Sequence, residues 1–298
     1  MEDTLPDSGK PNPGKQQPEI EPLQTYGLAD YHVHCDYSID AVGSIDEYCE
    51  AAVRKGLVEI CFTTHYDSNP DAGGRAEFIR VNGEKLPTSI EHLKPYVDDV
   101  MEARDKYFPY GLVVKLGLEF GWYPGCEKEA DRVRNAFEFE HFLCGIHELE
   151  NICFCCRDNF EKCFDRYSVE QMVAKYADNV VAASDTRLFT AIAHLDYVRK
   201  YGVGYYGEQL DEVIRREAEA RIFPALIKNG TPLEVNTSGM RRGLKEYFPS
   251  VSLVNAARRA GVNVYFLGSD AHEPQHVGWD FDAAAPLASM ASVRCELD

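Results

Sequence analysis

Short apolar runs alternate with longer, more polar segments along most of the chain. Seven runs have the length of β-strands and cover residues 28–34, 58–64, 112–118, 139–146, 188–193, 232–235 and 262–267. Between them, helices are predicted at residues 44–55, 89–107, 126–136, 168–183, 207–229 and 250–261. Strands that alternate with helices form parallel sheets with right-handed crossovers. The pattern therefore predicts an α/β protein with seven parallel strands.

Two features of the pattern concern the segments outside the strands. Ser44 and Glu47 have the spacing of a capping box, which predicts the start of the first helix. The longest polar stretch, residues 66–88, carries Arg75 and Arg80 and is expected to be a loop that lies over the functional face.

Length and composition narrow the class of protein. A chain of 298 residues is long enough for one α/β barrel, which needs about 250 residues. No apolar run reaches the roughly 18 residues of a membrane span. Residues 1–25 contain five prolines and no apolar core of a signal peptide, so we expect a disordered tail there. We therefore expect a cytoplasmic protein with a single domain over residues 26–298.

Charge and cysteine content add two further expectations. The formal net charge of −18 argues against a nucleic-acid partner, because such binding depends on Lys and Arg. Bound cations would still make a pocket in this acidic protein positive. The ten cysteines suit a reducing compartment, and we expect the segment with Cys153, Cys155, Cys156 and Cys163 to carry reduced thiols, because its spacing matches no zinc ribbon or ferredoxin motif.

Histidine and carboxylate residues mark the ends of six of the seven predicted strands. Histidine and carboxylate are ligands of Zn²⁺, Fe²⁺ and Mn²⁺. A closed barrel brings the carboxyl ends of its strands to one centre, whereas an open sheet spreads them along an edge. The pattern therefore favours a closed barrel with a cluster of metal ligands at one end. The residues are His32, His34, Asp40, His65, Glu119, His147, His194, Asp270 and His272.

The first and last strands each end in a pair of candidate ligands. His32 and His34 are two residues apart, so both side chains point to the same side of an extended strand. Asp270 and His272 repeat this spacing after the last strand. In a barrel the first and last strands are neighbours, so the two pairs are expected to face one another.

This ordered series resembles the polymerase-and-histidinol-phosphatase (PHP) superfamily of metal phosphoesterases. The segment 233–242, Leu-Glu-Val-Asn-Thr-Ser-Gly-Met-Arg-Arg, and the Tyr-Phe-Pro-Ser segment at 247–250 are similar to signatures of its histidinol-phosphatase branch. The resemblance covers residues 26–285. It implies a distorted seven-stranded (β/α) TIM-like barrel and a centre of three divalent transition-metal ions, with Zn, Fe and Mn left open.

The resemblance also implies a role for each matching residue. One ion would bind His32, His34, Glu119 and Asp270, a second the bridging Glu119, His147 and His194, and a third Asp40, His65 and His272. Of these, Glu119, Asp270 and His272 are also expected to serve catalysis. Apart from the resemblance, phosphate needs a cationic partner besides the metals, for which Arg241 or Arg242 after the sixth strand, or Arg187, is a candidate, and either Asp196 or solvent is expected to protonate the leaving alcohol.

The expected activity is that of a metal-dependent phosphomonoesterase, namely a histidinol-phosphatase of histidine biosynthesis. A PHP phosphoesterase for another small substrate, such as a nucleotide or a phosphorylated amino acid, is the nearest alternative. A non-catalytic metal-binding barrel is a second alternative, although no ligand of the series is missing. Barrel amidohydrolases usually bridge their metals with a lysine, whereas Glu119 has that position here. The expected partner is a small phosphorylated molecule, and a homo-oligomer stays open.

Overall fold

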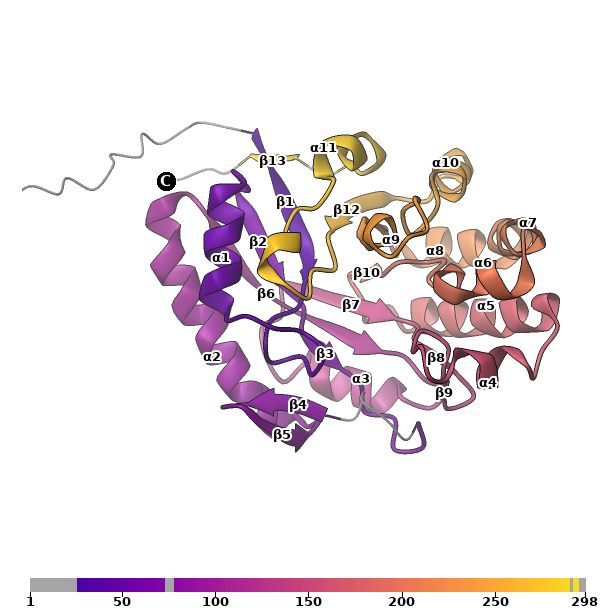
Figure 1. Ribbon diagram of the computed structural model, residues 1–298, viewed down its shortest axis with the longest axis horizontal. Helices are drawn as coiled ribbons and strands as arrows, with labels where there is room; N and C mark the ends of the chain where they lie inside the picture. Colours follow the sequence, from indigo (N-terminus) through magenta and orange to yellow (C-terminus); the bar gives the residue numbers. More distant parts are fainter. Residues whose placement is uncertain (1–25, 73–77, 290–291, 295–298) are drawn as a thin grey trace, which may run out of the picture.

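Seven parallel strands form a nearly closed barrel with helices around it (Figure 1). This computed structural model describes residues 26–72, 78–289 and 292–294, and the tail predicted for residues 1–25 lies outside them. The α/β barrel predicted from the sequence is confirmed. In spatial order the strands are β12 (Val264–Gly268), β11 (Leu233–Asn236), β10 (Ala191–Ile192), β7 (His141–Gly145), β6 (Val113–Gly121), β2 (Glu59–Phe62) and β1 (Tyr26–Val33).

Backbone hydrogen bonds close the barrel between the first strand and the segment after the last one. The Asp270 N–H donates to the His32 carbonyl and the His34 N–H donates to the Ala271 carbonyl, both at 2.8 Å. Nearer the start of β1, the same edge pairs with the antiparallel strand β13 (Ser292–Arg294). The closure therefore brings the two predicted ligand pairs together, as the barrel hypothesis requires.

A register shift in β1 separates the apolar interior of the barrel from its polar end. The pairing of β1 with β2 shifts between Asp30 and Val33. Such irregularities redirect side chains near functional sites. The Tyr31 ring packs 4.9 Å from the Phe266 ring inside the barrel, whereas the next residue, His32, contacts the polar cluster described below.

Most predicted helices are present with slightly different ends. They are α1 (Ile45–Arg54), α2 (Ile90–Tyr107), α3 (Glu127–Arg134), α5 (Val169–Thr186) and α10 (Val251–Ala260). At α1 the predicted capping box is confirmed: the Ser44 N–H donates to Glu47 Oε2 at 2.8 Å, and Ser44 Oγ accepts from the Glu47 N–H at 3.4 Å.

The single helix predicted for residues 207–229 is divided. It consists of α7 (Gln209–Glu217) and α8 (Phe223–Asn229), which are joined by a π-helical turn, Ala218–Ile222. Pro224 explains the break, because proline has no N–H for the hydrogen bond to the preceding turn.

Several short elements lie in segments for which no regular structure was predicted. The helices are α4 (Phe160–Phe164), α6 (Arg199–Tyr206), α9 (Ser238–Arg241) and α11 (Phe281–Ala284), with 3₁₀ turns at Phe108–Tyr110, Pro274–His276 and Ala285–Leu287. The short strand β3 (His65–Tyr66) pairs with β6, as β2 does. β8 (Glu148–Leu149) and β9 (Ile152–Cys153) form a hairpin directly after the β7 end.

The loop expected at residues 66–88 also contains a hairpin, which corrects the prediction. β4 (Phe78–Val81) and β5 (Glu84–Pro87) pair antiparallel around Asn82 and Gly83, which have φ values of 52° and 80°. Asn-Gly is a strong signal for the two-residue turns of hairpins, so the sequence did contain the information. Arg75 lies outside the described residues, whereas Arg80 is on β4.

The cysteine-rich segment differs from its prediction. Cys153 and Cys156 form a disulfide, so the expectation of reduced thiols is wrong for this pair. The thiol of Cys155 is free, and its Sγ lies 3.3 Å from Cys153 Sγ. In the described part of the chain, no helix is both long and apolar enough to cross a membrane.

Candidate metal centre

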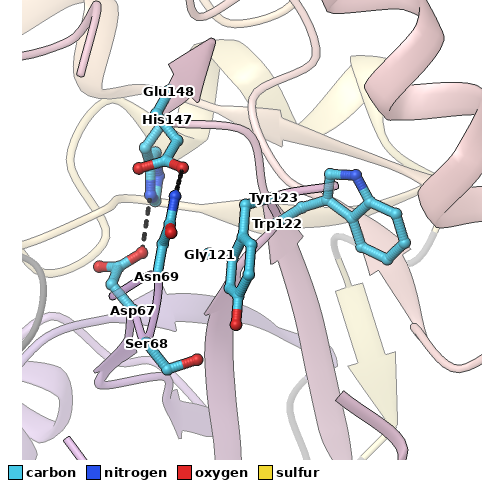
Figure 2. Close-up of a pocket in the computed structure, with 8 residues that line it drawn as sticks. All are labelled: Asp67, Ser68, Asn69, Gly121, Trp122, Tyr123, His147 and Glu148. Carbon is cyan, nitrogen blue, oxygen red and sulfur yellow. Dashed lines mark hydrogen bonds and ion pairs between the residues drawn. The ribbon is translucent and has the colours of Figure 1, made fainter. Parts of the chain in front are cut away.

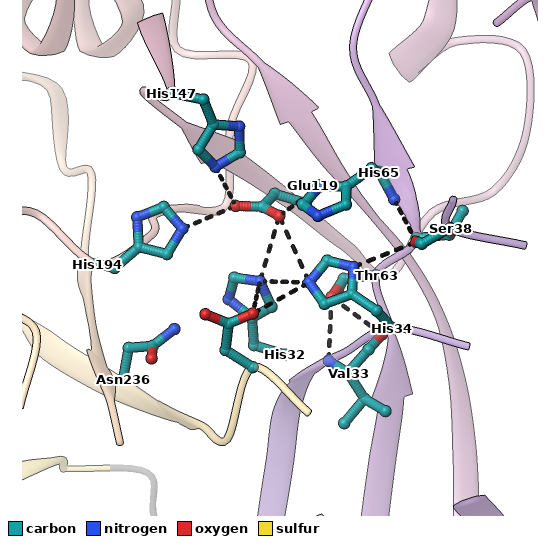
Figure 3. A network of polar contacts seen from close by, with 12 residues as sticks. His32, Val33, His34, Ser38, Thr63, His65, Glu119, His147, His194 and Asn236 are labelled. Atoms are coloured by element: carbon teal, nitrogen blue, oxygen red, sulfur yellow. Dashed lines mark hydrogen bonds and ion pairs between the residues drawn. The ribbon is translucent and has the colours of Figure 1, made fainter. Parts of the chain in front are cut away.

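The predicted ligands meet at the carboxyl end of the barrel. Glu119 lies near the end of β6, and His147 and His194 each follow the last residue of a strand by two positions. Figure 3 shows imidazole rings from several strands directed at the Glu119 carboxylate. Four overlapping groups have donor atoms within 4.8 Å of one another: His32, His34 and Asp270; His32, Glu119 and His194; His65, Glu119 and His147; and His34, His65 and His272.

Glu119 is the central residue of the cluster. Its Oε1 lies 2.9 Å from His194 Nε2 and 3.2 Å from His147 Nε2. Its Oε2 lies 2.9 Å from His65 Nδ1 and 3.3 Å from His32 Nε2. The two oxygens therefore face different sets of imidazoles, which is the arrangement expected of a bridging carboxylate.

The electrostatics of Glu119 follow from these neighbours. The side chain is completely buried, and burial alone would raise the pKa of its carboxyl group. The nearby His32 and His147 outweigh burial, and the pKa of Glu119 lies well below its usual range. The carboxyl group is thus held as an anion inside the protein.

The ligand pairs at the ends of the first and last barrel strands face one another, as predicted. Nε2 of His32 and Nε2 of His34 are 3.0 Å apart, and Asp270 Oδ1 lies 3.4 Å from His34 Nε2. His272 Nδ1 is also 3.4 Å from Asp270 Oδ1. Asp270 has a φ of 52°, a conformation that non-glycine residues adopt mainly where surrounding structure requires it.

Asp40 completes the cluster from the loop after β1. Its Oδ2 lies 3.5 Å from His272 Nε2, and its Oδ1 lies 3.8 Å from His65 Nε2. All nine predicted ligands are therefore connected in one cluster. The three sets implied by the family resemblance overlap with the observed groups, and the assignment of each ligand to one ion stays a prediction.

The donor set fits divalent cations. It consists of imidazole nitrogens and carboxylate oxygens, which are ligands of transition metals. Glu119 Oε2 is buried and makes no hydrogen bond of good geometry, although two imidazole nitrogens lie within 3.3 Å of it. A buried polar atom without a good hydrogen bond is costly, so this oxygen is consistent with coordination of an ion.

Glycine residues make room for the inward-facing side chains. A Cβ atom at Gly145 on β7 would lie 2.5 Å from Glu119 Oε1 and 2.7 Å from His147 Nε2. A Cβ atom at Gly268 on β12 would lie 1.8 Å from Glu234 Oε1. No side chain larger than hydrogen fits at these positions without displacing the cluster.

Glu234 and Asp67 orient the histidines, a role that the sequence did not predict for either residue. Glu234 Oε1 lies 2.8 Å from His32 Nδ1, and Glu234 Oε2 accepts from the His194 N–H at 2.9 Å. Asp67 Oδ1 lies 3.5 Å from His147 Nδ1. A carboxylate on the second ring nitrogen fixes the orientation of a metal-binding histidine. The signal for Glu234 was a charged residue within an apolar strand.

Comparison with known proteins agrees with this geometry. The PHP domain family matches residues 30–238, which is more than half of the chain. The chain belongs to the PHP domain family. A protein of Deinococcus radiodurans named "Probable histidinol-phosphatase" is 31% identical over 259 residues, which cover 86% of this chain and 90% of that protein.

Two further relatives come from Lactococcus lactis. A histidinol-phosphatase is 25% identical over 244 residues, covering 82% of this chain and 83% of that protein. The crystal structure of a histidinol phosphate phosphatase, complexed with zinc, L-histidinol and phosphate, has a TM-score of 0.68 and 20% identity. The match covers 89% of this chain and 94% of that structure. Within the PHP family, the chain thus belongs to the histidinol-phosphatase branch.

Two cationic side chains lie beside the PHP centre. Arg242 Nη2 is 3.6 Å from Asp270 Oδ2, and its guanidinium group lies 5.9 Å from the centre of the Tyr197 ring. Lys200 Nζ lies 3.3 Å from the Tyr197 hydroxyl. Burial and the nearby Arg242 lower the pKa of Lys200. Lys200 was missed in the sequence, since nothing there marks α6 as a neighbour of the site.

Arg241 has a different environment from Arg242. Its Nη2 donates to the carbonyl oxygens of Ser269 at 2.8 Å and Asp270 at 3.0 Å. Arg241 therefore holds the backbone turn that presents Asp270, and Arg242 is the better placed of the two to bind phosphate.

Two of the predicted site residues lie away from the cluster. Arg187 ends α5 before β10, and its Nε donates to Asn229 Oδ1 at 3.3 Å. His194 follows the other end of β10, so Arg187 is not a candidate phosphate ligand. Asp196 Oδ2 accepts from the Ser250 N–H at 2.9 Å, and burial raises the pKa of its carboxyl group to about 7. This position leaves solvent as the expected proton source for the leaving alcohol.

A small pocket adjoins the centre at His147. Figure 2 shows its lining, in which Asp67 contacts His147 and Asn69 donates to Glu148. Tyr123 and Trp122 from the segment after β6 complete the wall. Two carboxylates suit a small cationic group.

Proposed function

We propose that this chain is a metal-dependent phosphomonoesterase that hydrolyses L-histidinol phosphate to L-histidinol and phosphate. The observation that carries the proposal is the buried Glu119 carboxylate between imidazoles from four parts of the barrel, beside Arg242 and Lys200. The substrate is inferred from the histidinol-phosphatase relatives, one of which is 31% identical over 86% of this chain.

The proposed centre holds three divalent transition-metal ions on the nine ligands. Bound cations of this kind lower the pKa of a coordinated water and neutralise charge on phosphate oxygens. Glu119 supplies both of its oxygens, and Glu234 and Asp67 keep the rings of His32 and His147 in a fixed orientation. Zinc, iron and manganese all suit this donor set.

The chain's own cations position the phosphate. Arg242 offers a planar fork of N–H donors, and Lys200 offers an ammonium group, and both lie near the Tyr197 ring. Charge-assisted hydrogen bonds of this type are stronger than those between neutral groups. We assign the ammonium group of the substrate to the carboxylates of Asp67 and Glu148, which line a pocket with room for about one water-sized group.

A phosphate-release assay tests the proposal. Enzyme loaded with zinc, iron or manganese is assayed with histidinol phosphate, phosphoserine and a nucleoside monophosphate, and each preparation is compared with one treated with chelator. We expect the highest kcat/KM with histidinol phosphate and loss of activity after metal removal. If a nucleotide or phosphoserine gives a tenfold higher kcat/KM, the named substrate is wrong although the phosphoesterase assignment stands. Absence of phosphate release from every substrate would contradict the enzymatic function.

A further inference from the structure

Asp40 differs from the other eight predicted ligands in how it is held. Those eight lie in or directly after barrel strands, and their side chains are at most 19% exposed. Asp40 lies in the loop between β1 and α1, and 47% of its side chain is exposed. A ligand on an exposed loop needs another part of the protein to fix its position, because ordering a loop costs conformational entropy.

The guanidinium group of Arg80 on β4 lies within this loop. Its Nη1 donates to the carbonyl oxygens of Asp36 at 2.7 Å and Ala41 at 3.1 Å, and its Nη2 donates to that of Ile39 at 2.7 Å. These residues flank Asp40 on both sides. One side chain therefore connects the start, the middle and the end of the loop.

Backbone contacts attach the hairpin to the same loop. The Arg80 N–H donates to the Tyr37 carbonyl at 2.8 Å, and Ser38 forms an antiparallel bridge with Ile79. Nη1 of Arg80 also lies 3.2 Å from the Ser38 carbonyl. The β4–β5 hairpin thus supports the loop from outside the barrel.

The contacts explain why the residue is arginine. Among the described residues, its side-chain hydrogen bonds go to backbone carbonyl groups at four positions of the loop, and the guanidinium group offers five N–H donors in a fixed fork. Lysine carries the same charge, but its three donors share one atom and cannot reach separated acceptors in the same way.

We propose that Arg80 is a positioning residue for the metal centre. By holding residues 36–41, it keeps the Asp40 carboxylate 3.5 Å from His272 and 3.8 Å from His65. The inference rests on the proposed function, because it assigns Asp40 to one ion of the metal centre.

Metal content tests the inference without relying on activity. We expect Arg80→Lys to bind about one ion per chain fewer than the wild type, or to lose one ion to a chelator at least tenfold faster. Asp40→Asn is expected to show the same deficit, and the double variant to show no further loss. Arg80→Gln, which keeps two planar N–H donors, is expected to be intermediate. Arg104→Lys is the matched control, since Arg104 Nε donates to the Val114 carbonyl at 2.9 Å away from the centre.

The outcomes separate this inference from the proposed function. Wild-type metal content and chelator resistance in Arg80→Lys would overturn the positioning role, and so would an additional loss in the double variant. If circular dichroism shows that both Arg80→Lys and Arg80→Gln are unfolded, Arg80 has a general stabilising role, and the positioning role is overturned. A wild-type protein that binds no metal would instead contradict the proposed function.

Discussion

The Glu119 side chain shows how one residue links folding to chemistry. An isolated carboxylate in the interior is strongly unfavourable, and removal of its partners leaves an uncompensated charge. Here imidazoles lie within 3.3 Å of both carboxylate oxygens, so the charge is compensated from two sides. The same arrangement allows the residue to bridge cations when they bind.

Glu119→Gln tests the bridging role. Glutamine keeps the size of the side chain but removes the charge, so we expect loss of bound metal. Phosphatase activity is expected to decrease more than about 100-fold, which exceeds the loss typical of residues that only orient metal ligands. Elemental analysis and phosphate release measure the two effects. Glu59→Gln is the control, because Glu59 pairs with Lys115 at 2.9 Å outside the cluster. Wild-type turnover in Glu119→Gln would show that Glu119 is structural.

Arg242 and Lys200 make a second residue-scale prediction. Removal of either cation deletes a charge-assisted contact to phosphate that contributes roughly 1.5–3 kcal/mol. We therefore expect Arg242→Ala and Lys200→Ala to lower kcat/KM for histidinol phosphate by roughly 10- to 150-fold without a change in metal content. Lys175→Ala, at an exposed pair with Glu150, is the control and is expected to retain full activity. An unchanged kcat/KM in both active-site variants would contradict the phosphate-binding role.

The sequence predicted the metal ligands better than the residues that surround them. His65, Glu119 and His194 follow apolar strands, and that pattern alone places them at one end of a barrel. Lys200 and Asp67 carry no such signal, because their positions depend on how α6 and the segment after β3 pack against the site. Asp196 shows the converse: it is two residues from a ligand in the chain, yet it faces the N-terminus of α10.

At the scale of elements, the barrel strands and most of the helices between them were predictable, whereas the short elements in the connecting loops were not. Strand β10 has only two residues in the sheet, yet its apolar sequence was sufficient to place His194. The β4–β5 hairpin was missed because its exposed strand β5 lacks an apolar face, although Asn82 and Gly83 indicate its turn. Tertiary contacts decide such segments more than local pattern does.

Strand β7 provides a prediction at this scale. Alanine usually suits a strand better than glycine, but a Cβ atom at Gly145 would lie 2.5 Å from Glu119 Oε1. We expect Gly145→Ala to lower metal content and to decrease activity at least about tenfold, since misplaced ligands cost this much in other metal sites. The protein is expected to remain folded by circular dichroism.

Gly204→Ala is the matched control for this variant. Gly204 lies in helix α6, and a Cβ atom there would meet no atom within 4 Å. The change is expected to raise the free energy of unfolding by about 0.4–1 kcal/mol and to leave metal content unchanged. Equal metal content in Gly145→Ala and Gly204→Ala would show that the cluster tolerates the added methyl group.

At the scale of the whole molecule, charge and metal binding are connected. The chain has a formal net charge of −18, and three of the nine predicted ligands are carboxylates. Three divalent cations would add six positive charges at one end of the barrel, which makes that end attractive to a phosphate dianion within an acidic protein. These cations would bind ligands from across the chain, from His32 to His272, so binding would be coupled to the folded state.

This coupling leads to a prediction about metal number and stability. We expect protein purified without chelator to contain three transition-metal ions per chain by elemental analysis. Because the ions bind the folded chain and not the unfolded one, their removal is expected to lower the Tm. At a free ion concentration 100 times Kd, each occupied site raises the free energy of unfolding by about 2.7 kcal/mol. Asp40→Asn is expected to contain about two ions and to show a smaller decrease in Tm on chelation. A value near one ion per chain at full activity would contradict the trinuclear centre. One ion needs only about four ligands, so most of the six imidazoles and three carboxylates of the cluster would then have another role.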